Sequence, residues 1–170
     1  FEKYFSQIGK PFKEILNELN IKNNHYKIKK CYDKYSILNL GLIKFYPKTL
    51  KTLKKLKKEG FLLCIVTSKD KKRTKLILKK HLNLFKIIQC PQYNLKGKPH
   101  SDQINRIIKK LNIKKNKCIY IGDTHVDYLT AKNSKIDFLF SEWGYSKKLK
   151  IFINSIKKLE EINKKIKLAN

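Results

Sequence analysis

The sequence contains no methionine, and arginine is nearly absent: Arg73 and Arg106 are the only two among 41 basic residues. Because position 1 is not a methionine, we expect the sequence to begin partway through a gene product or after a processing event. A protein that reads nucleic-acid bases usually relies on arginine for bidentate contacts. Here the net charge of +28 is carried by lysines spread along every predicted helix. This distribution favours solvated lysine surfaces over a nucleic-acid site, although the field would still attract a small anionic substrate.

Cysteine is sparse, and long apolar runs are missing. The four cysteines lie far apart and form no Cys-x-x-Cys pair, so the sequence indicates neither a zinc site nor a disulfide framework (Cys31, Cys64, Cys90 and Cys118). A reducing, cytoplasmic setting is therefore the default expectation. The longest apolar run, residues 61–66, is far too short to span a bilayer, and the N-terminus has no apolar core of a signal peptide. We predict that the chain has no membrane partner.

The 170 residues suffice for one ordinary domain with a small appendage. Up to about Ile43 the apolar residues recur with helical spacing, so this part is predicted to be helical and without strands. After Pro47, short apolar runs alternate with amphipathic stretches. Strands are predicted at residues 61–66, 85–90, 118–121, 136–140 and 151–153, with helices between them and a closing helix from near Ser155. This alternation is typical of βαβ units and predicts an α/β fold with a Rossmann-like, mostly parallel sheet.

Polar side chains follow three of the predicted strands. Asp123 comes just after residues 118–121, and Asp127 lies four residues further on, at the start of a predicted helix. Paired carboxylates at a strand end suggest Mg²⁺, which is usually held by one or two carboxylates together with waters and phosphate oxygens. Thr67 and Lys98 follow two other strands, and a hydroxyl and an ammonium can bind phosphate oxygens. Because ligands of open α/β sheets bind at the carboxyl ends of the strands, we expect all four residues to share one crevice.

The four residues lie in three short runs: Ile-Val-Thr-Ser-Lys at 65–69, Gly-Lys-Pro-His-Ser-Asp at 97–102 and Ile-Gly-Asp-Thr-His-Val-Asp at 121–127. These runs resemble the motifs of the haloacid dehalogenase-like (HAD) hydrolase superfamily, and within it the phosphoglycolate-phosphatase-like group with a small helical cap. Tyr46 and Pro47 look like the family's return from cap to core. The resemblance implies a partial helical cap at residues 1–44 and an α/β core at residues 45–170.

The same resemblance implies roles for the site residues. Thr67 would hydrogen-bond the transferring phosphoryl group, with Ser68 beside it, and Lys98 would neutralise the nucleophile and the phosphate. Asp123 would ligate Mg²⁺, and Asp127 would ligate it or orient its waters. Each residue also has a plain structural interpretation: a turn threonine, one lysine among many, an acid favoured at a helix start. Their convergence on one crevice favours the functional interpretation.

One part of the family pattern is missing. The family's nucleophile is the first aspartate of an Asp-x-Asp motif on the central strand, ahead of the cap, and this sequence contains no Asp-x-Asp. The resemblance therefore implies that the N-terminal strand of the core is absent from this chain. As it stands, the chain should form no phosphoaspartyl intermediate. It should also be poorly stable, because the strands on both sides of the gap would have unpaired backbone edges.

From these observations we predict a Mg²⁺-dependent phosphatase that acts on a small phosphorylated metabolite through an aspartyl-phosphate, present here without its nucleophile. Two alternatives stay open. One is a catalytically dead relative that binds phosphate or a partner, and the other is a lysine-rich nucleic-acid-binding protein. Phosphoglycolate, a sugar phosphate and pyrophosphate are all admissible substrates, and so is phosphomutase chemistry.

Overall fold

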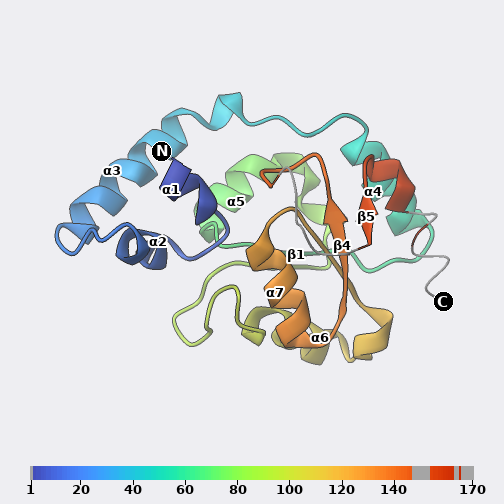
Figure 1. Ribbon diagram of the computed structural model, residues 1–170. Helices are drawn as coiled ribbons and strands as arrows, with labels where there is room; N and C mark the ends of the chain where they lie inside the picture. Colours follow the sequence, from blue (N-terminus) through green and yellow to red (C-terminus); the bar gives the residue numbers. More distant parts are fainter. Residues whose placement is uncertain (1, 147–153, 163–164, 166–170) are drawn as a thin grey trace.

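The computed structural model describes residues 2–146, 154–162 and 165. It begins with three helices and one 3₁₀ turn: α1 (Glu2–Ser6), α2 (Phe12–Glu18), α3 (His25–Leu38) and η1 (Leu40–Leu42). These N-terminal helices, called the cap from here on after the predicted domain, lie to one side of the molecule, and an extended segment returns from them to the rest of the chain (Figure 1). The prediction of a helical, strand-free N-terminal part is confirmed for the described residues up to Ile43. The division between cap and core at residues 44 and 45 stays a prediction.

The rest of the chain alternates helices and strands. The elements are α4 (Thr49–Lys58), β1 (Cys64–Val66), α5 (Lys71–Leu78), η2 (Lys79–Leu84), β2 (Ile87–Gln89), α6 (Asp102–Leu111), η3 (Lys115–Lys117), β3 (Ile119–Gly122), α7 (His125–Ser134), β4 (Asp137–Ser141), β5 (Ser155–Ile156) and η4 (Leu159–Glu161). The predicted α/β class is therefore correct. Within the described residues, no helix is long and apolar enough to cross a membrane.

The described strands form two separate parallel ladders. Strand β1 pairs with β2, and β3 pairs with β4, which in turn pairs with β5. No pairing joins β1 to β3 in the described part of the chain, so the facing edges of these two strands are not bonded to each other. The ladders nevertheless lie close together: burial and the nearby Cys64 thiol, at β1, raise the pKa of the Cys118 thiol, just before β3.

A single apolar core extends over both ladders. Its centre is formed by four buried side chains (Leu56, Leu139, Ile156 and Ile162), and the partly buried residues against it include Phe61 and Leu63, which lead into β1, and Ile119 and Ile121 of β3. Removing these side chains from water is the main favourable contribution to folding. The shared core therefore holds the two ladders together where backbone pairing does not.

The C-terminal segment differs from the prediction. A closing helix was expected from near Ser155, but Ser155 and Ile156 form strand β5, which pairs with Phe140 and Ser141 of β4. The apolar spacing of this segment suits a helix. The strand, however, buries Ile156 completely and pairs with the open edge of β4, and these tertiary contacts outweigh the local preference for a helix. The strand predicted at 151–153 and most of the segment after Ile162 lie outside the described residues.

The strands predicted at 118–121 and 136–140 are correct to within one residue, as β3 and β4, whereas the two earlier predicted strands are correctly placed but too long. Residues 61–66 supply only the three-residue β1, and residues 85–90 only β2. Continuous apolar runs do not mark strand ends, because residues that approach a strand can be buried without joining its ladder. Phe61 and Leu63 are of this kind, since they pack against the core ahead of β1. The α5 helix ends at Leu78, because Lys79 has a φ of 45° and starts a 3₁₀ turn.

Candidate active site

Asp127 and Lys98 form a buried ion pair beside the end of β3. The Lys98 Nζ atom lies 2.7 Å from Asp127 Oδ1, and the two side chains are only 9% and 6% exposed. The Tyr120 hydroxyl donates to the same carboxylate oxygen at 2.9 Å. Burial alone would raise the pKa of Asp127, but the charge of Lys98 and the hydrogen bonds from Lys98, Thr124 and Tyr120 outweigh it and lower the pKa.

The second oxygen of Asp127 closes the N-terminus of α7. Asp127 Oδ2 accepts hydrogen bonds from the Thr124 backbone N–H at 3.2 Å and from the Thr124 hydroxyl at 2.7 Å, while Thr124 Oγ1 accepts from the Asp127 N–H at 3.1 Å. This is a capping box. Gly122 makes room for it, since a Cβ there would lie 2.4 Å from the Asp127 Cβ. All four hydrogen-bond positions of the carboxylate are thus in use.

Asp123 stands at the end of β3 with fewer partners. Its Oδ2 accepts a hydrogen bond from the Tyr145 backbone N–H at 2.7 Å. Burial and, to a smaller degree, the charge of Asp127 raise its pKa, although the Tyr145 and Lys98 contacts act in the other direction. The loop after β4 approaches it so closely that a Cβ at Gly144 would lie 2.1 Å from the carboxylate. Asp123 is therefore a partly desolvated carboxylate that a cation would stabilise.

The turn after β1 carries Thr67 and Ser68. The Thr67 backbone N–H donates to the Gln89 carbonyl at 3.1 Å, which extends the β1–β2 ladder by one bond, and the Thr67 hydroxyl accepts from the Lys69 N–H at 3.1 Å. The Ser68 hydroxyl donates to the Gly9 carbonyl of the cap at 2.6 Å. The turn thus has defined contacts to both the core and the cap.

A short cap loop, residues 9–11 between α1 and α2, touches all three motif runs. Gly9 bonds Ser68, and a Cβ at Gly9, whose φ is +106°, would meet Thr124 Oγ1 at 3.1 Å. Pro11 packs so tightly against Gly97 that a Cβ at Gly97 would lie 2.7 Å from the proline ring. Because Gly97 precedes Lys98 directly, the loop connects the Thr67 turn, the Lys98 loop and the Asp123–Asp127 turn. The turns and loops that carry the predicted residues therefore lie around one small region, as expected from their positions at strand ends.

Beside this region is a cavity of about 710 Å³. Pro11 of the cap, Ser68, Gly97 and the buried Gln103 of α6 are among its lining residues, while Asp123 and Lys98 do not line it. The cavity lies next to the predicted site, on the side of the Lys98 loop, and offers space for a bound molecule larger than a phosphate.

Two contributors were not found from the sequence. The hydrogen bond from Tyr120 to Asp127 and the backbone bond from Tyr145 to Asp123 involve residues with no motif of their own. The only available signals were the position of Tyr120 within the strand that carries Asp123 and the run of Trp143, Gly144 and Tyr145 after the late strand.

Comparison with known proteins shows which family the chain belongs to. The sequence profile of the haloacid dehalogenase-like hydrolase family matches residues 2–141. The chain belongs to this family. Among curated relatives, a phosphoglycolate phosphatase from Mannheimia succiniciproducens is 26% identical over 123 residues, covering 71% of this chain and 55% of the relative. A glyceraldehyde 3-phosphate phosphatase from Pyrococcus furiosus is 25% identical over 146 residues, covering 84% of this chain and 61% of the relative. This HAD-like chain spans about half the length of the curated relatives it matches.

Solved structures show the same fold. A haloacid dehalogenase-like family protein from Streptococcus pneumoniae superposes with a TM-score of 0.81 at 20% identity, over 97% of this chain and 81% of that one. CbbY from Rhodobacter sphaeroides, solved in complex with phosphate, gives a TM-score of 0.80 at 12% identity, over 95% of this chain and 79% of that one. The predicted HAD-like, phosphoglycolate-phosphatase-like resemblance is confirmed.

Proposed function

We propose that this HAD-like chain carries most of the site of a Mg²⁺-dependent phosphatase for a small phosphorylated metabolite. The observation that carries the proposal is the buried Lys98–Asp127 pair, 2.7 Å apart, next to Asp123 at the end of β3. A cation and a partly desolvated acid held side by side suit a phosphate with its metal ion. The family membership supports this activity, as do relatives named as phosphatases of phosphoglycolate and of glyceraldehyde 3-phosphate.

The two acids fit a metal ion unequally. Asp123 fits it well, because a bound cation would offset the burial that raises its pKa. Asp127 could ligate a cation only by giving up one of its four hydrogen bonds. No group of three or more His, Cys, Asp or Glu side chains that could hold a metal exists among the described residues. This suits Mg²⁺, which often takes only one or two carboxylates and completes its shell with waters and phosphate oxygens.

The remaining residues would hold the phosphoryl group. Thr67 and Ser68 would hydrogen-bond its oxygens, and the Lys98 ammonium, oriented by Asp127, would neutralise its charge as charge shifts during transfer. When bound, Mg²⁺ would supply further neutralisation of the same oxygens. The phosphate found with CbbY, which shares this fold, supports a phosphate site of this kind. The neighbouring 710 Å³ cavity would give the leaving group room.

The nucleophile would come from a strand between β1 and β3. A parallel strand in that position would join the two ladders into one sheet and bring a carboxylate to the shared strand ends. One oxygen of this carboxylate would form a bond to phosphorus while the ester P–O bond breaks, and the released alkoxide would take up a proton. Water would then hydrolyse the acyl phosphate and restore the carboxylate. The chain as given is thus proposed to be inactive alone. A cytoplasmic setting, supported by four unpaired cysteines, is proposed with it.

The test extends the chain with an N-terminal strand that ends in Asp-x-Asp. We expect hydrolysis of phosphoglycolate that requires Mg²⁺ and falls at least about a hundredfold in Asp123→Asn and in Lys98→Ala. Lys110→Ala is the matched control, because Lys110 is an exposed lysine near the end of α6 that does not line the cavity, and its loss should leave turnover unchanged. Unchanged turnover in both site variants would rule out the proposed site. Phosphate binding without turnover by the extended chain would favour the catalytically dead relative.

A further inference from the structure

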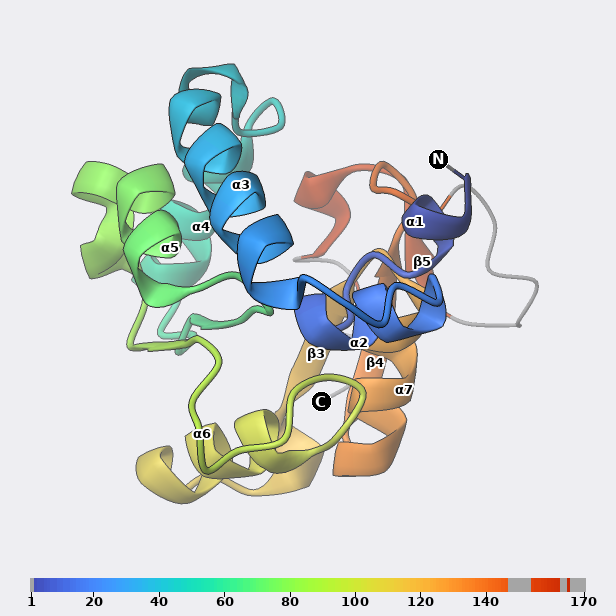
Figure 2. The same ribbon diagram turned by 90° about the vertical axis from the view of Figure 1, so that its left-hand side faces the viewer.

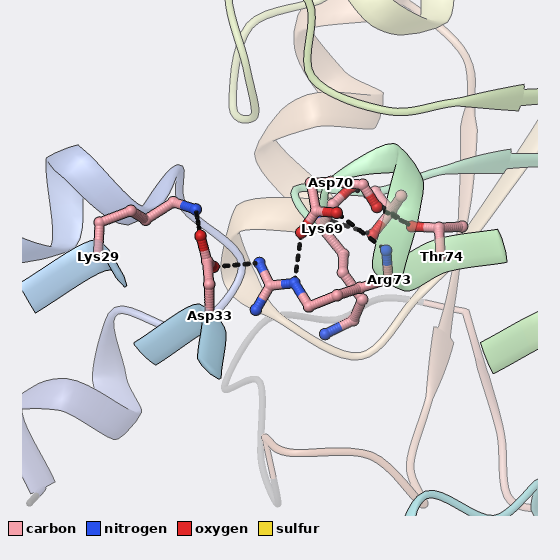
Figure 3. A network of polar contacts seen from close by, with 7 residues as sticks. Lys29, Asp33, Lys69, Asp70, Arg73 and Thr74 are labelled. Carbon is pink, nitrogen blue, oxygen red and sulfur yellow. Dashed lines mark hydrogen bonds and ion pairs between the residues drawn. The ribbon is translucent and has the colours of Figure 1, made fainter. Parts of the chain in front are cut away.

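Helix α3 of the cap has no fully buried residue, although Ile28 and Tyr32 are half-buried. The hydrophobic effect therefore contributes less to its position than it does for a helix with a buried apolar face. Its contact with the core involves Asp33 and Tyr32, which face Arg73 of α5. Figure 3 shows Lys29 and Asp33 on α3, with the Arg73 side chain extending from α5 toward Asp33. Figure 2 shows the same two helices as neighbours.

The Arg73 guanidinium has three partners in three directions. Its Nε donates to Asp70 Oδ2, and its Nη2 lies 3.4 Å from Asp33 Oδ1. The guanidinium carbon Cζ lies over the Tyr32 ring, 5.0 Å from the ring centroid. Tyr32 in turn stacks on Phe12 of α2, 4.6 Å between centroids. Arg73 is only 5% exposed, whereas the side chains of Asp33 and Asp70 are 35% and 41% exposed, so solvent partly screens both ion pairs from the carboxylate side.

The same arginine is tied to the turn that carries Thr67. Asp70 is the N-cap of α5 and accepts a hydrogen bond from the Arg73 backbone N–H at 2.9 Å. The Asp70 carbonyl accepts from the Thr74 hydroxyl at 2.7 Å. Immediately before this cap, the Lys69 N–H bonds the Thr67 hydroxyl at 3.1 Å. A displacement of the guanidinium would therefore move the cap of α5, which begins where the Thr67 turn ends.

Lysine could not replace this arginine. Arg73 is one of two arginines in a chain that uses lysine at nearly every other basic position. A guanidinium presents a planar fork that can bond two carboxylates while its face stacks on a ring, whereas an ammonium is a compact point charge. The structure uses arginine where this shape is needed.

We propose that Arg73 is a positioning residue that couples the cap helix α3 to the Thr67–Lys69 turn through Asp33 on one side and Asp70 on the other. The cap and the turn then hold one another in place. The coupling stands on contacts of the chain itself and does not depend on the proposed phosphatase activity.

Asp33→Asn tests the coupling, because it weakens the α3 contact and leaves the Asp70–Arg73 bond intact. Amide hydrogen exchange should become about fivefold faster both in α3 and at Lys69, whereas exchange at Ile121 in β3 should not change. Arg73→Lys should accelerate the same amides about tenfold, because it removes the fork and the ring contact together. If Arg73→Lys unfolds α5, the exchange rates of Asp33→Asn still test the coupling between α3 and the turn.

Glu160→Gln is the matched control. It breaks the Lys48–Glu160 pair, 2.8 Å apart, which involves neither the cap helices nor the Thr67 turn, and should leave exchange in α3 and at Lys69 unaffected. Faster exchange in α3 with no change at Lys69 in Asp33→Asn would overturn the proposal, because the pair would then only brace α3. No change at either place would overturn it as well.

Discussion

Asp123 and Asp127 belong to one short turn, yet their surroundings are opposite. Asp127 is buried, accepts four hydrogen bonds and pairs with Lys98, and its pKa is lowered. Asp123 accepts one bond from Tyr145 and has a raised pKa. The protein stabilises the charge of Asp127 and tolerates that of Asp123. This difference teaches that Asp127 holds the turn in shape, and it supports the proposal that Asp123 is the acid that binds a ligand.

The largest expected effect is on stability when the charge of Asp127 is removed. Asp127→Asn leaves the Lys98 ammonium buried without a counter-charge and should lower the free energy of unfolding by about 3–5 kcal/mol. Urea unfolding at neutral pH measures it. Asp123→Asn is the matched control and should cost far less, because the Asp123 charge is not stabilised by the fold. Equal losses in the two variants would contradict the comparison.

A smaller loss is expected from Tyr120→Phe. The variant keeps the ring and removes one of the four hydrogen bonds to Asp127. Because that bond joins a buried hydroxyl to a charged acceptor, the free energy of unfolding should fall by about 1.5–3 kcal/mol. In an Asp127→Asn background the same substitution should cost clearly less, since the acceptor charge is gone. Additive losses in the double variant would show that Tyr120 acts independently of Asp127.

Much of this arrangement could be predicted, for reasons that are local. Aspartate is among the residues preferred at a helix N-cap, and the side chain of Asp70, at the start of α5, accepts a hydrogen bond from the Arg73 N–H. Helices with regular apolar spacing, such as α6, were found because neighbours three and four residues apart share a face. The positions of Thr67, Lys98, Asp123 and Asp127 at strand ends followed from short apolar runs that stop before polar residues.

The unpredicted parts depend on contacts between residues far apart in sequence. Nothing near Gly9 indicates that its carbonyl accepts from Ser68, 59 residues away. Strand β5 was read as helix because its pairing with β4 is not encoded in its own spacing. The sequence singled out Lys98 by its motif and its place after a strand, but it did not show that Lys98 is buried against Asp127. Local sequence patterns therefore predict the helices, most strands and the candidate site residues. Which of these residues contact one another depends on tertiary structure that the local patterns do not contain.

A modest effect is expected from Mg²⁺. If Asp123 is the ligand, Mg²⁺ at ten times its dissociation constant should stabilise the chain by about 1.4 kcal/mol, because it binds the folded state alone. Thermal unfolding with and without Mg²⁺ measures this. Asp123→Asn should abolish the shift, and Asp102→Asn, an acid at the start of α6, should keep it. A shift that survives in Asp123→Asn would assign the metal elsewhere.

The smallest effect, and the sharpest test of the comparison, is the pH dependence of the two variants without metal. The ordinary pKa of both acids is 3.8. Asp127, with its lowered pKa in the folded state, contributes stability that is present above pH 3.8 and lost as the pH falls through the lower value. Asp123, with its raised pKa, contributes stability that is present below pH 3.8 and lost as the pH rises through the higher value.

The two variants should therefore diverge in opposite directions in urea unfolding carried out with EDTA across the acid range. Relative to that of the parent chain, the free energy of unfolding of Asp127→Asn should fall as the pH rises toward 3.8. That of Asp123→Asn should rise, relative to the parent chain, as the pH rises beyond 3.8. The gain should be the smaller of the two, since Asp123 is only partly buried and solvent screens its interactions. Parallel pH profiles would mean that the fold treats both carboxylates alike, and the division between a residue that holds the turn in shape and one that binds a ligand would be wrong.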